Sequence, residues 1–136
     1  MAEDCEFCRI ARGEGDAHTL YEDDRTVAFL DENPAVEGHA LVIPKAHRES
    51  VLGAQAASTG AVFETVRAVS NALSAAVDPD GFSVFHSTGS LVGNVEHAHV
   101  HVVPRFDDDE VHVALPRRRL TDQDGDRLAA AIHAEL

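Results

Sequence analysis

Three histidines alternate with small apolar residues over residues 97–102, which read His-Ala-His-Val-His-Val. An extended backbone turns successive side chains to opposite faces, so His97, His99 and His101 are predicted to share one face of a strand. A neutral imidazole can act as a nucleophile, a proton donor or acceptor, or a metal ligand. The spacing alone fits a reactive face, and it fits equally a solvated strand face or an adventitious metal site.

Two cysteines near the N-terminus, Cys5 and Cys8, form a Cys-x-x-Cys pair. Two thiolates at this spacing supply half of a tetrahedral zinc site. A redox pair is a weaker interpretation, because no thioredoxin-like order of strand, helix and strand surrounds the cysteines. Two reduced cysteines without a ligand are the remaining alternative. We expect the pair to bind metal.

The strands that would position these residues follow from alternation and turn signals. Residues 18–22 and 26–30 are expected to form a hairpin across 23–25, and the apolar run 39–44 predicts a strand covered on both faces. Further strands are predicted over 81–86 and 95–105, so that all three histidines lie on the last strand. Residues 107–110, which read Asp-Asp-Asp-Glu, are expected to form a solvated acidic loop.

Helical patterns account for the remaining elements. A short helix is expected over 5–12, ended by Gly13. Ser58 or Thr59 can cap the longest helix, whose apolar stripe consists of Val62, Val66, Val69 and Leu73. A final helix is expected to begin near Thr121 and to present Leu128, Ile132 and Leu136.

Length, composition and charge restrict the class of protein. A chain of 136 residues fits one domain. The sequence has no apolar run of membrane-spanning length and no signal-peptide order, so we expect a cytoplasmic protein. The formal charge of −13 argues against binding to nucleic acid or anionic membranes. Lys45 is the only lysine, and this bias with abundant Asp and Glu suggests a halophilic protein whose activity rises with salt.

The triad together with Val103-Pro104-Arg105 resembles the signature of the histidine triad (HIT) family of nucleotide hydrolases and transferases. Segments 5–8, 28–34 and 38–47 resemble other family segments, in family order and at familiar separations. The resemblance implies a single HIT domain over residues 1–136 with an α+β, HIT-like fold: a five-stranded antiparallel sheet, one long helix, and short N- and C-terminal helices. It also implies a homodimer whose sheets join into ten strands.

The same resemblance implies roles for individual residues. His99 would be the nucleophile that forms a nucleotidyl-histidine, with a backbone carbonyl near the first histidine holding its other ring nitrogen. His101 would contact the phosphate or assist proton transfer. Asp31 would accept hydrogen bonds from the ribose hydroxyls, for which two carboxylate oxygens are suited. Phe29 would help line the base pocket, although an apolar strand residue more often belongs to the core.

The segment before the triad departs from the family pattern, since the usual glutamine is absent. Asn94 stands in the place of the usual serine or threonine and can donate a hydrogen bond, so it joins the predicted catalytic residues. Gly93 can let the backbone approach phosphate, and Ser87 stands for a family asparagine on the leaving-group side. Ordinary turn residues are the alternative interpretation of Asn94 and Ser87.

The resemblance also completes the metal site, adding His47 and His97 to Cys5 and Cys8. Four protein ligands make a closed structural zinc site. Such a site would fix the N-terminal helix to the sheet and orient the strand that bears His99. The proposed chemistry requires no catalytic metal.

We therefore expect a nucleotidyl hydrolase that cleaves a phosphoanhydride or phosphoramidate bond at the α-phosphate of a nucleotide that contains adenosine. Dinucleoside polyphosphates and adenosine phosphoramidates or aminoacyl adenylates are the candidate substrates. The main alternative is a non-catalytic nucleotide-binding regulatory or interaction module that keeps the zinc site. A protein that binds a transition metal through the three histidines is a third hypothesis.

Overall fold

A computed structural model describes residues 5–53, 55–89 and 97–136 of the chain. Five strands form one antiparallel sheet in the order β1-β2-β3-β5-β4, which confirms the predicted α+β fold class. The order of elements along the chain is α1 (Glu6–Ala11), β1 (Thr19–Glu22), β2 (Thr26–Leu30), β3 (Ala40–Pro44), α2 (Ala56–Val77), β4 (Gly81–Phe85), β5 (Val100–Arg105) and α3 (Asp122–Glu135).

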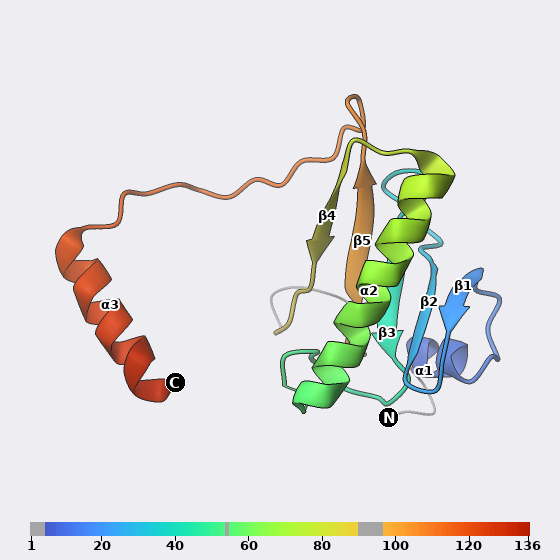
Figure 1. Cartoon of the computed structure of the whole chain (residues 1–136), viewed down its shortest axis with the longest axis horizontal. Coiled ribbons are helices and arrows are strands. Elements are labelled where there is room, and N and C mark those ends of the chain that lie inside the picture. The colour runs from blue at the N-terminus through green and yellow to red at the C-terminus, as the bar shows by residue number, and fades with distance from the viewer. Residues whose placement is uncertain (1–4, 54, 90–96) are drawn as a thin grey trace.

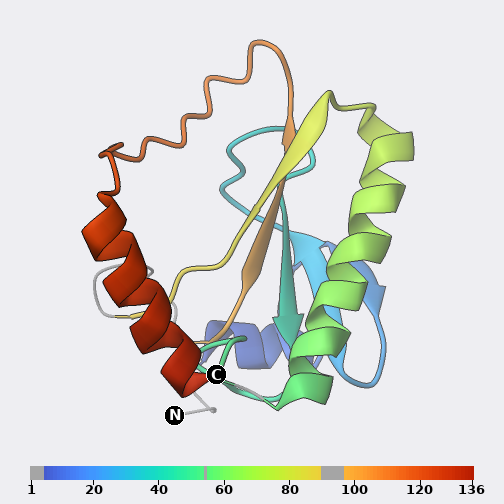
Figure 2. The same ribbon diagram turned by 60° about the vertical axis from the view of Figure 1, so that its left-hand side comes forward.

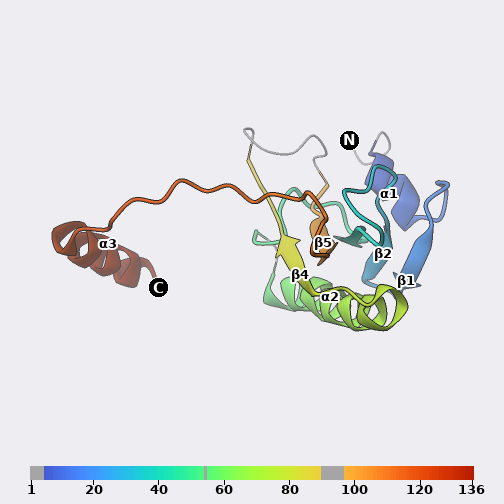
Figure 3. The same ribbon diagram turned by 90° about the horizontal axis from the view of Figure 1, so that it is seen from above.

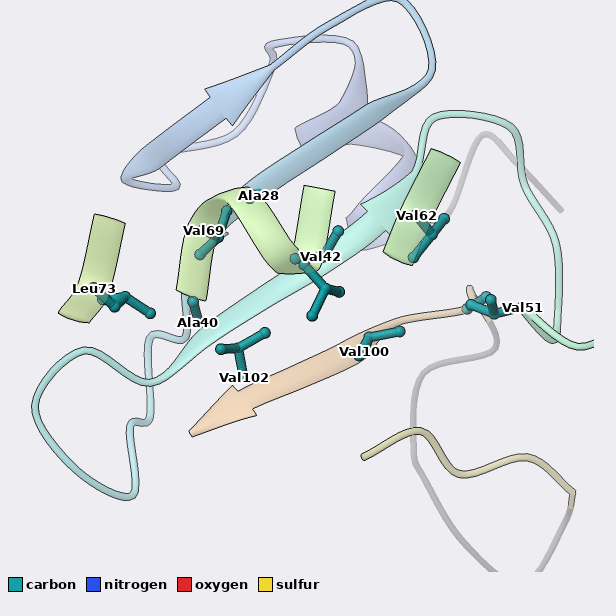
Figure 4. Packing of buried hydrophobic residues seen from close by; sticks show 11 residues of the cluster. Ala28, Ala40, Val42, Val51, Val62, Val69, Leu73, Val100 and Val102 are labelled. Atoms are coloured by element: carbon teal, nitrogen blue, oxygen red, sulfur yellow. The ribbon is translucent and has the colours of Figure 1, made fainter. Parts of the chain in front are cut away.

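The sheet lies between two helices of very different length (Figure 3): α2 covers one face and α1 packs on the other. Strand β3 is buried along its whole length, as its apolar sequence predicts. On the α2 side, valines of the sheet point toward the apolar stripe of α2 (Figure 4). Each fully buried valine side chain contributes about 1.5–3 kcal/mol of burial free energy. The main members of this core are Val42, Val100, Val102, Val62, Val69 and Leu73.

The opposite face of the sheet packs against α1. Phe7 and Cys8 of α1 contact a second apolar cluster that includes Phe29, Leu41 and Ile43. Alternation along the chain assigns the even-numbered residues Ala98, Val100 and Val102 to the α2 side. The three odd-numbered histidines therefore lie on the α1 side.

Two predicted boundaries were wrong. Helix α2 begins at Ala56 with Gln55 as its N-cap, so neither Ser58 nor Thr59 is the cap. The Thr59 hydroxyl donates instead to the carbonyl of Val51 (2.7 Å), which makes it a tertiary contact. Strand β5 begins at Val100 rather than at residue 95, because the N–H of Ala98 donates to the Arg48 carbonyl outside the ladder. Residues 95 and 96 lie outside the described part of the chain.

The acidic loop also differs from its prediction at one residue. The Asp109 side chain is only 6% exposed and accepts a hydrogen bond from Arg105 at 2.6 Å. It also accepts the backbone N–H groups of Phe106 and Val111 (both 2.9 Å). These hydrogen bonds hold the pKa of the Asp109 carboxyl well below its usual range. Asp109 therefore organises the turn after β5, whereas Asp107, Asp108 and Glu110 are exposed as expected.

Helix α3 begins after Thr121, as predicted, and the Thr121 side chain accepts a hydrogen bond from the N–H of Asp124. An extended segment carries α3 away from the sheet (Figures 1 and 2), and no α3 residue is buried. Leu128 and Ile132 are exposed on it. Among the described helices, none has both the length and the apolar character to cross a membrane.

Candidate active site and metal centre

His97 is fully buried, and its two ring nitrogens have different partners. Nε2 lies 2.7 Å from the carbonyl oxygen of Pro44. Because a carbonyl only accepts, Nε2 carries the proton and donates it. The lone pair of Nδ1 then faces two sulfurs, Cys5 Sγ at 3.4 Å and Cys8 Sγ at 3.3 Å. Burial lowers the pKa of His97, against the Pro44 hydrogen bond, which favours the neutral ring that a metal ligand requires.

His47 completes a group of four metal-binding side chains. Its Nδ1 lies 3.0 Å from Cys8 Sγ, and the ligand atoms of Cys5, Cys8, His47 and His97 all lie within 4.8 Å of one another. A tetrahedral zinc ion with usual bond lengths separates sulfur and nitrogen ligands by roughly 3.5 Å, close to the distances found. Burial, together with Cys5, raises the pKa of the Cys8 thiol to about 11, so a bound cation would have to stabilise the thiolate. The four residues fit a zinc ion.

His99 is oriented by the main chain of its neighbour in the triad. Its Nδ1 lies 2.9 Å from the His97 carbonyl oxygen and must therefore donate a proton. The Nε2 atom of a neutral ring then carries the lone pair. Phe7 packs edge-on against the ring, with ring centroids 5.3 Å apart. His99 thus has the tautomer that a nucleophilic Nε2 requires.

A chain of hydrogen bonds fixes the tautomer of His101. The N–H of Ala35 donates to His39 Nδ1 (3.0 Å), so in a neutral ring the proton of His39 is on Nε2. His39 Nε2 lies 2.9 Å from His101 Nδ1, which must accept this proton. His101 therefore keeps its own proton on Nε2. Burial first, and then the neighbouring His99 and His39, lower the pKa of His101 to about 4.

Asp31, His39 and His101 form a second group of potential metal ligands, with ligand atoms within 4.8 Å of one another. The hydrogen-bond chain argues against a metal there, because the proton on His39 Nε2 occupies the lone-pair position that a metal would need. Burial lowers the pKa of His39 despite the nearby Asp31 carboxylate. The three triad histidines thus face three different partners. The transition-metal hypothesis requires them to converge on one ion, and they do not.

Asp31 follows β2 directly, and its side chain is 18% exposed. Its Oδ1 accepts the N–H of Asn33 (2.9 Å), and its Oδ2 lies 3.5 Å from His39 Nε2. A carboxylate with unused acceptor capacity beside His101 is suited to a diol. Phe29, in contrast, is 3% exposed and packs edge-on against Phe7 within the α1-side core.

The sequence did not single out the aromatic and histidine neighbours of the triad. Phe85 stacks on His101, with ring centroids 4.4 Å apart and an interplanar angle of 15°. The pairing of β4 with β5 places Phe85 directly opposite His101, and β3 brings Leu41 to its other side. No local motif encodes this register, and for that reason the sequence did not predict Phe85 as a neighbour of His101. His86 is a further omission and contacts the main chain of His99.

The three predicted residues before the triad have different outcomes. Ser87 is exposed after the end of β4, and the adjacent His86 makes the contacts toward the triad. Gly93 and Asn94 lie outside the described residues. The predicted roles of all three stay predictions.

Comparison with known proteins gives consistent results. A model of the HIT domain matches residues 12–108. The chain is 33% identical to adenylylsulfatase HINT3 of Arabidopsis thaliana over 140 residues, covering 100% of this chain and 71% of the relative. It is 32% identical to adenosine 5'-monophosphoramidase hnt1 of Schizosaccharomyces pombe over 102 residues, 74% of each protein. A zinc-bound histidine triad family protein from Mycobacterium smegmatis has a similar structure, with a TM-score of 0.74 and 30% identity over 99% of this chain and 96% of that one.

Proposed function

The chain belongs to the HIT family, and from that membership we propose that it hydrolyses nucleotides through a covalent intermediate on His99. The observation that carries this proposal is the hydrogen bond from His99 Nδ1 to the His97 carbonyl. It leaves the Nε2 lone pair for attack on phosphorus. Relatives of this chain include an adenylylsulfatase and an adenosine 5'-monophosphoramidase, which supports a nucleotide hydrolase in general.

In the proposed mechanism, His99 Nε2 forms a bond to the α-phosphorus while the bond from phosphorus to the leaving group breaks. The leaving group takes up a proton from solvent, and the nucleotide remains attached through a phosphorus–nitrogen bond. The oxygen of water then bonds to phosphorus while the phosphorus–nitrogen bond breaks, and the remaining proton of that water passes to solvent. This step releases the nucleoside monophosphate and returns the neutral imidazole with its Nε2 lone pair. His101 Nε2–H would donate to a phosphate oxygen or to the leaving group.

We propose an adenosine nucleotide as the substrate, bound through its ribose hydroxyls to Asp31. Cleavable bonds include the phosphoramidate, the mixed anhydride with sulfate, and the phosphoanhydride of dinucleoside polyphosphates. The leaving-group side of the pocket would involve Ser87, Gly93 and Asn94. Their departure from the family pattern means that leaving-group preference has to be measured directly.

The direct test compares wild type with His99→Ala on a panel of adenosine phosphoramidate, adenylyl sulfate and diadenosine polyphosphates. Loss of the nucleophile is expected to reduce turnover about a thousandfold or more. His101 variants, in which hydrolysis of the intermediate is expected to be slow, should show a mass increase of one nucleoside monophosphate on His99. Replacement of the exposed His133 by Ala is the matched control. Equal slow turnover by wild type and His99→Ala would instead support the non-catalytic nucleotide-binding module.

The zinc ion proposed at Cys5, Cys8, His47 and His97 is structural, since all four positions are taken by protein ligands. The Pro44 carbonyl that accepts from His97 Nε2 orients this ligand, as partners outside the coordination sphere of a zinc site commonly do. The similar structure from Mycobacterium smegmatis is zinc-bound, which supports the assignment.

We further propose a homodimer in which the β4 edges of two sheets pair. Strand β4 is at one end of the strand order, and Val84 and Phe85 are 43% and 45% exposed on it. An unpaired edge strand with exposed apolar side chains is a template for pairing with another chain. A partner chain would also bury part of the exposed Leu128 and Ile132 side chains of α3.

A further inference from the structure

The nucleophile proposed above does not lie on a regular strand. Backbone pairing between β4 and β5 ends at Phe85 and His101, and β5 itself begins at Val100. Residues 97–99 must therefore be held by other contacts. On one side, the N–H of Ala98 donates to the Arg48 carbonyl at 2.6 Å.

The ring of His86 supplies the contact at His99 itself. His86 Nδ1 lies 3.0 Å from the carbonyl oxygen of His99. Because the carbonyl accepts, Nδ1 carries the proton, and in a neutral ring Nε2 is then an acceptor. Nε2 accepts the N–H of Val51 (3.3 Å) and lies 3.5 Å from Ser50 Oγ. A neutral His86 thus uses both ring nitrogens, one toward each segment.

The segment that contains Ser50 and Val51 is held in place by the core. Val51 is 1% exposed within the α2-side core, and its carbonyl accepts the Thr59 hydroxyl from the first turns of α2 (2.7 Å). His86 therefore connects the main chain of His99 to a part of the molecule that core packing immobilises. The pairing of β4 with β5 stops at Phe85, and the imidazole of the next residue, His86, holds the main chain there instead.

We propose that His86 is a positioning residue that fixes the peptide unit of His99, and with it the direction of the Nε2 lone pair. The inference rests on the proposed function of His99. Without the imidazole, the His99 carbonyl loses its donor and the peptide unit can rotate. The side chain would then sample directions other than the one needed for in-line attack. Misplacement by about an ångström is enough to cost up to a hundredfold in rate.

Two substitutions separate the donor from the rest of the ring. His86→Asn places an amide N–H close to the position of imidazole Nδ1 and keeps the donor to His99, although it cannot reach Val51. His86→Ala removes both contacts. His133→Ala, on the exposed face of α3, serves as the control. Thermal unfolding of each zinc-loaded protein checks that all three fold.

The first measurement is independent of activity: the Hδ2–Cδ2 NMR signal of the His99 ring in zinc-loaded protein. We expect one sharp signal in wild type and His86→Asn, and a broadened or split signal in His86→Ala. The second measurement is hydrolysis of an adenosine phosphoramidate. We expect kcat to fall about tenfold or more in His86→Ala, with KM within about threefold of wild type, and His86→Asn to recover most of kcat.

An unchanged His99 signal in His86→Ala overturns the inference, as does an Asn variant as impaired as the Ala variant in both measurements. If wild type hydrolyses none of the nucleotides tested, the proposed function fails. The NMR comparison still decides whether His86 positions His99.

Discussion

The three triad histidines share a side-chain type and one face, yet they differ in which ring nitrogen carries the proton. His97 and His101 hold it on Nε2, and His99 holds it on Nδ1. In each ring a single neighbour decides: the Pro44 carbonyl, His39, and the His97 carbonyl respectively. Identical residues thus receive different chemistry from the acceptors and donors around them.

The half-buried His101 makes stability depend on pH. In the unfolded chain it protonates near pH 6.5, whereas in the folded chain its pKa is about 4. Between these values the unfolded state binds more protons, so the free energy of unfolding falls as the pH drops through this window. The slope from this group is at most about 1.4 kcal/mol per pH unit. Urea unfolding of zinc-loaded protein at several pH values measures it.

The comparison for this prediction is His101→Gln, which cannot titrate. We expect its free energy of unfolding to fall less than that of wild type between about pH 7 and pH 5. His133→Gln, at an exposed site, should follow wild type. Parallel curves for wild type and His101→Gln would contradict the prediction.

At the scale of elements, regular periodicity made much of the fold predictable. The apolar run of β3 and the stripe of α2 were identified correctly, because burial on two faces or on one helical face leaves a pattern in the sequence. The start of β5 was wrong, since a hydrogen bond to the distant Arg48 ends the ladder. Neighbours of the triad such as Phe85 depend on strand register, which the hydrophobic pattern alone did not supply.

Substitution of Gly38, with Gly60 as a control, tests whether the segment before β3 depends on a glycine. Gly38 has φ +86, and a Cβ there would lie 3.2 Å from both Leu73 Cδ2 and Pro104 Cγ. Gly38→Ala is therefore expected to lower the free energy of unfolding by about 1–3 kcal/mol. It should also disturb the adjacent His39. Thermal or urea unfolding measures the change.

Gly60 provides the matched control inside α2, where a Cβ would meet nothing within 4 Å. Gly60→Ala should raise the free energy of unfolding by about 0.5–1 kcal/mol through helix propensity. If Gly38→Ala raised the free energy of unfolding as Gly60→Ala is expected to do, the predicted strain and close packing at Gly38 would be contradicted.

At the scale of the whole molecule, the proposed zinc centre joins distant parts of the chain. Cys5 and Cys8 lie at one end, His47 follows β3, and His97 precedes β5. Through the resemblance to the HIT family, the sequence predicted that these four residues would come together, because three family segments carry them: 5–8, 38–47 and the triad. The resemblance also implied that a backbone carbonyl near the first histidine would hold the His99 ring, and in the structure this carbonyl is that of His97 itself.

Purified protein is expected to contain one zinc ion per chain, measured by elemental analysis. Cys8→Ser should lose the metal and lower the free energy of unfolding by about 3 kcal/mol or more, because binding free energy adds to folding. Hydrolysis should persist in the fraction that stays folded. His101→Gln, which leaves all four ligands in place, should keep its zinc. Full zinc content in Cys8→Ser would rule out the proposed ligand set.

The group that orients His99 is a main-chain carbonyl rather than a side chain. Any residue at position 97 offers the same oxygen, so the identity of that side chain matters for the metal and not for the tautomer of the nucleophile. During evolution, a lineage that dispenses with the two cysteines can therefore also exchange the first histidine and still retain a reactive second one. Metal retention and turnover are separable traits in this architecture.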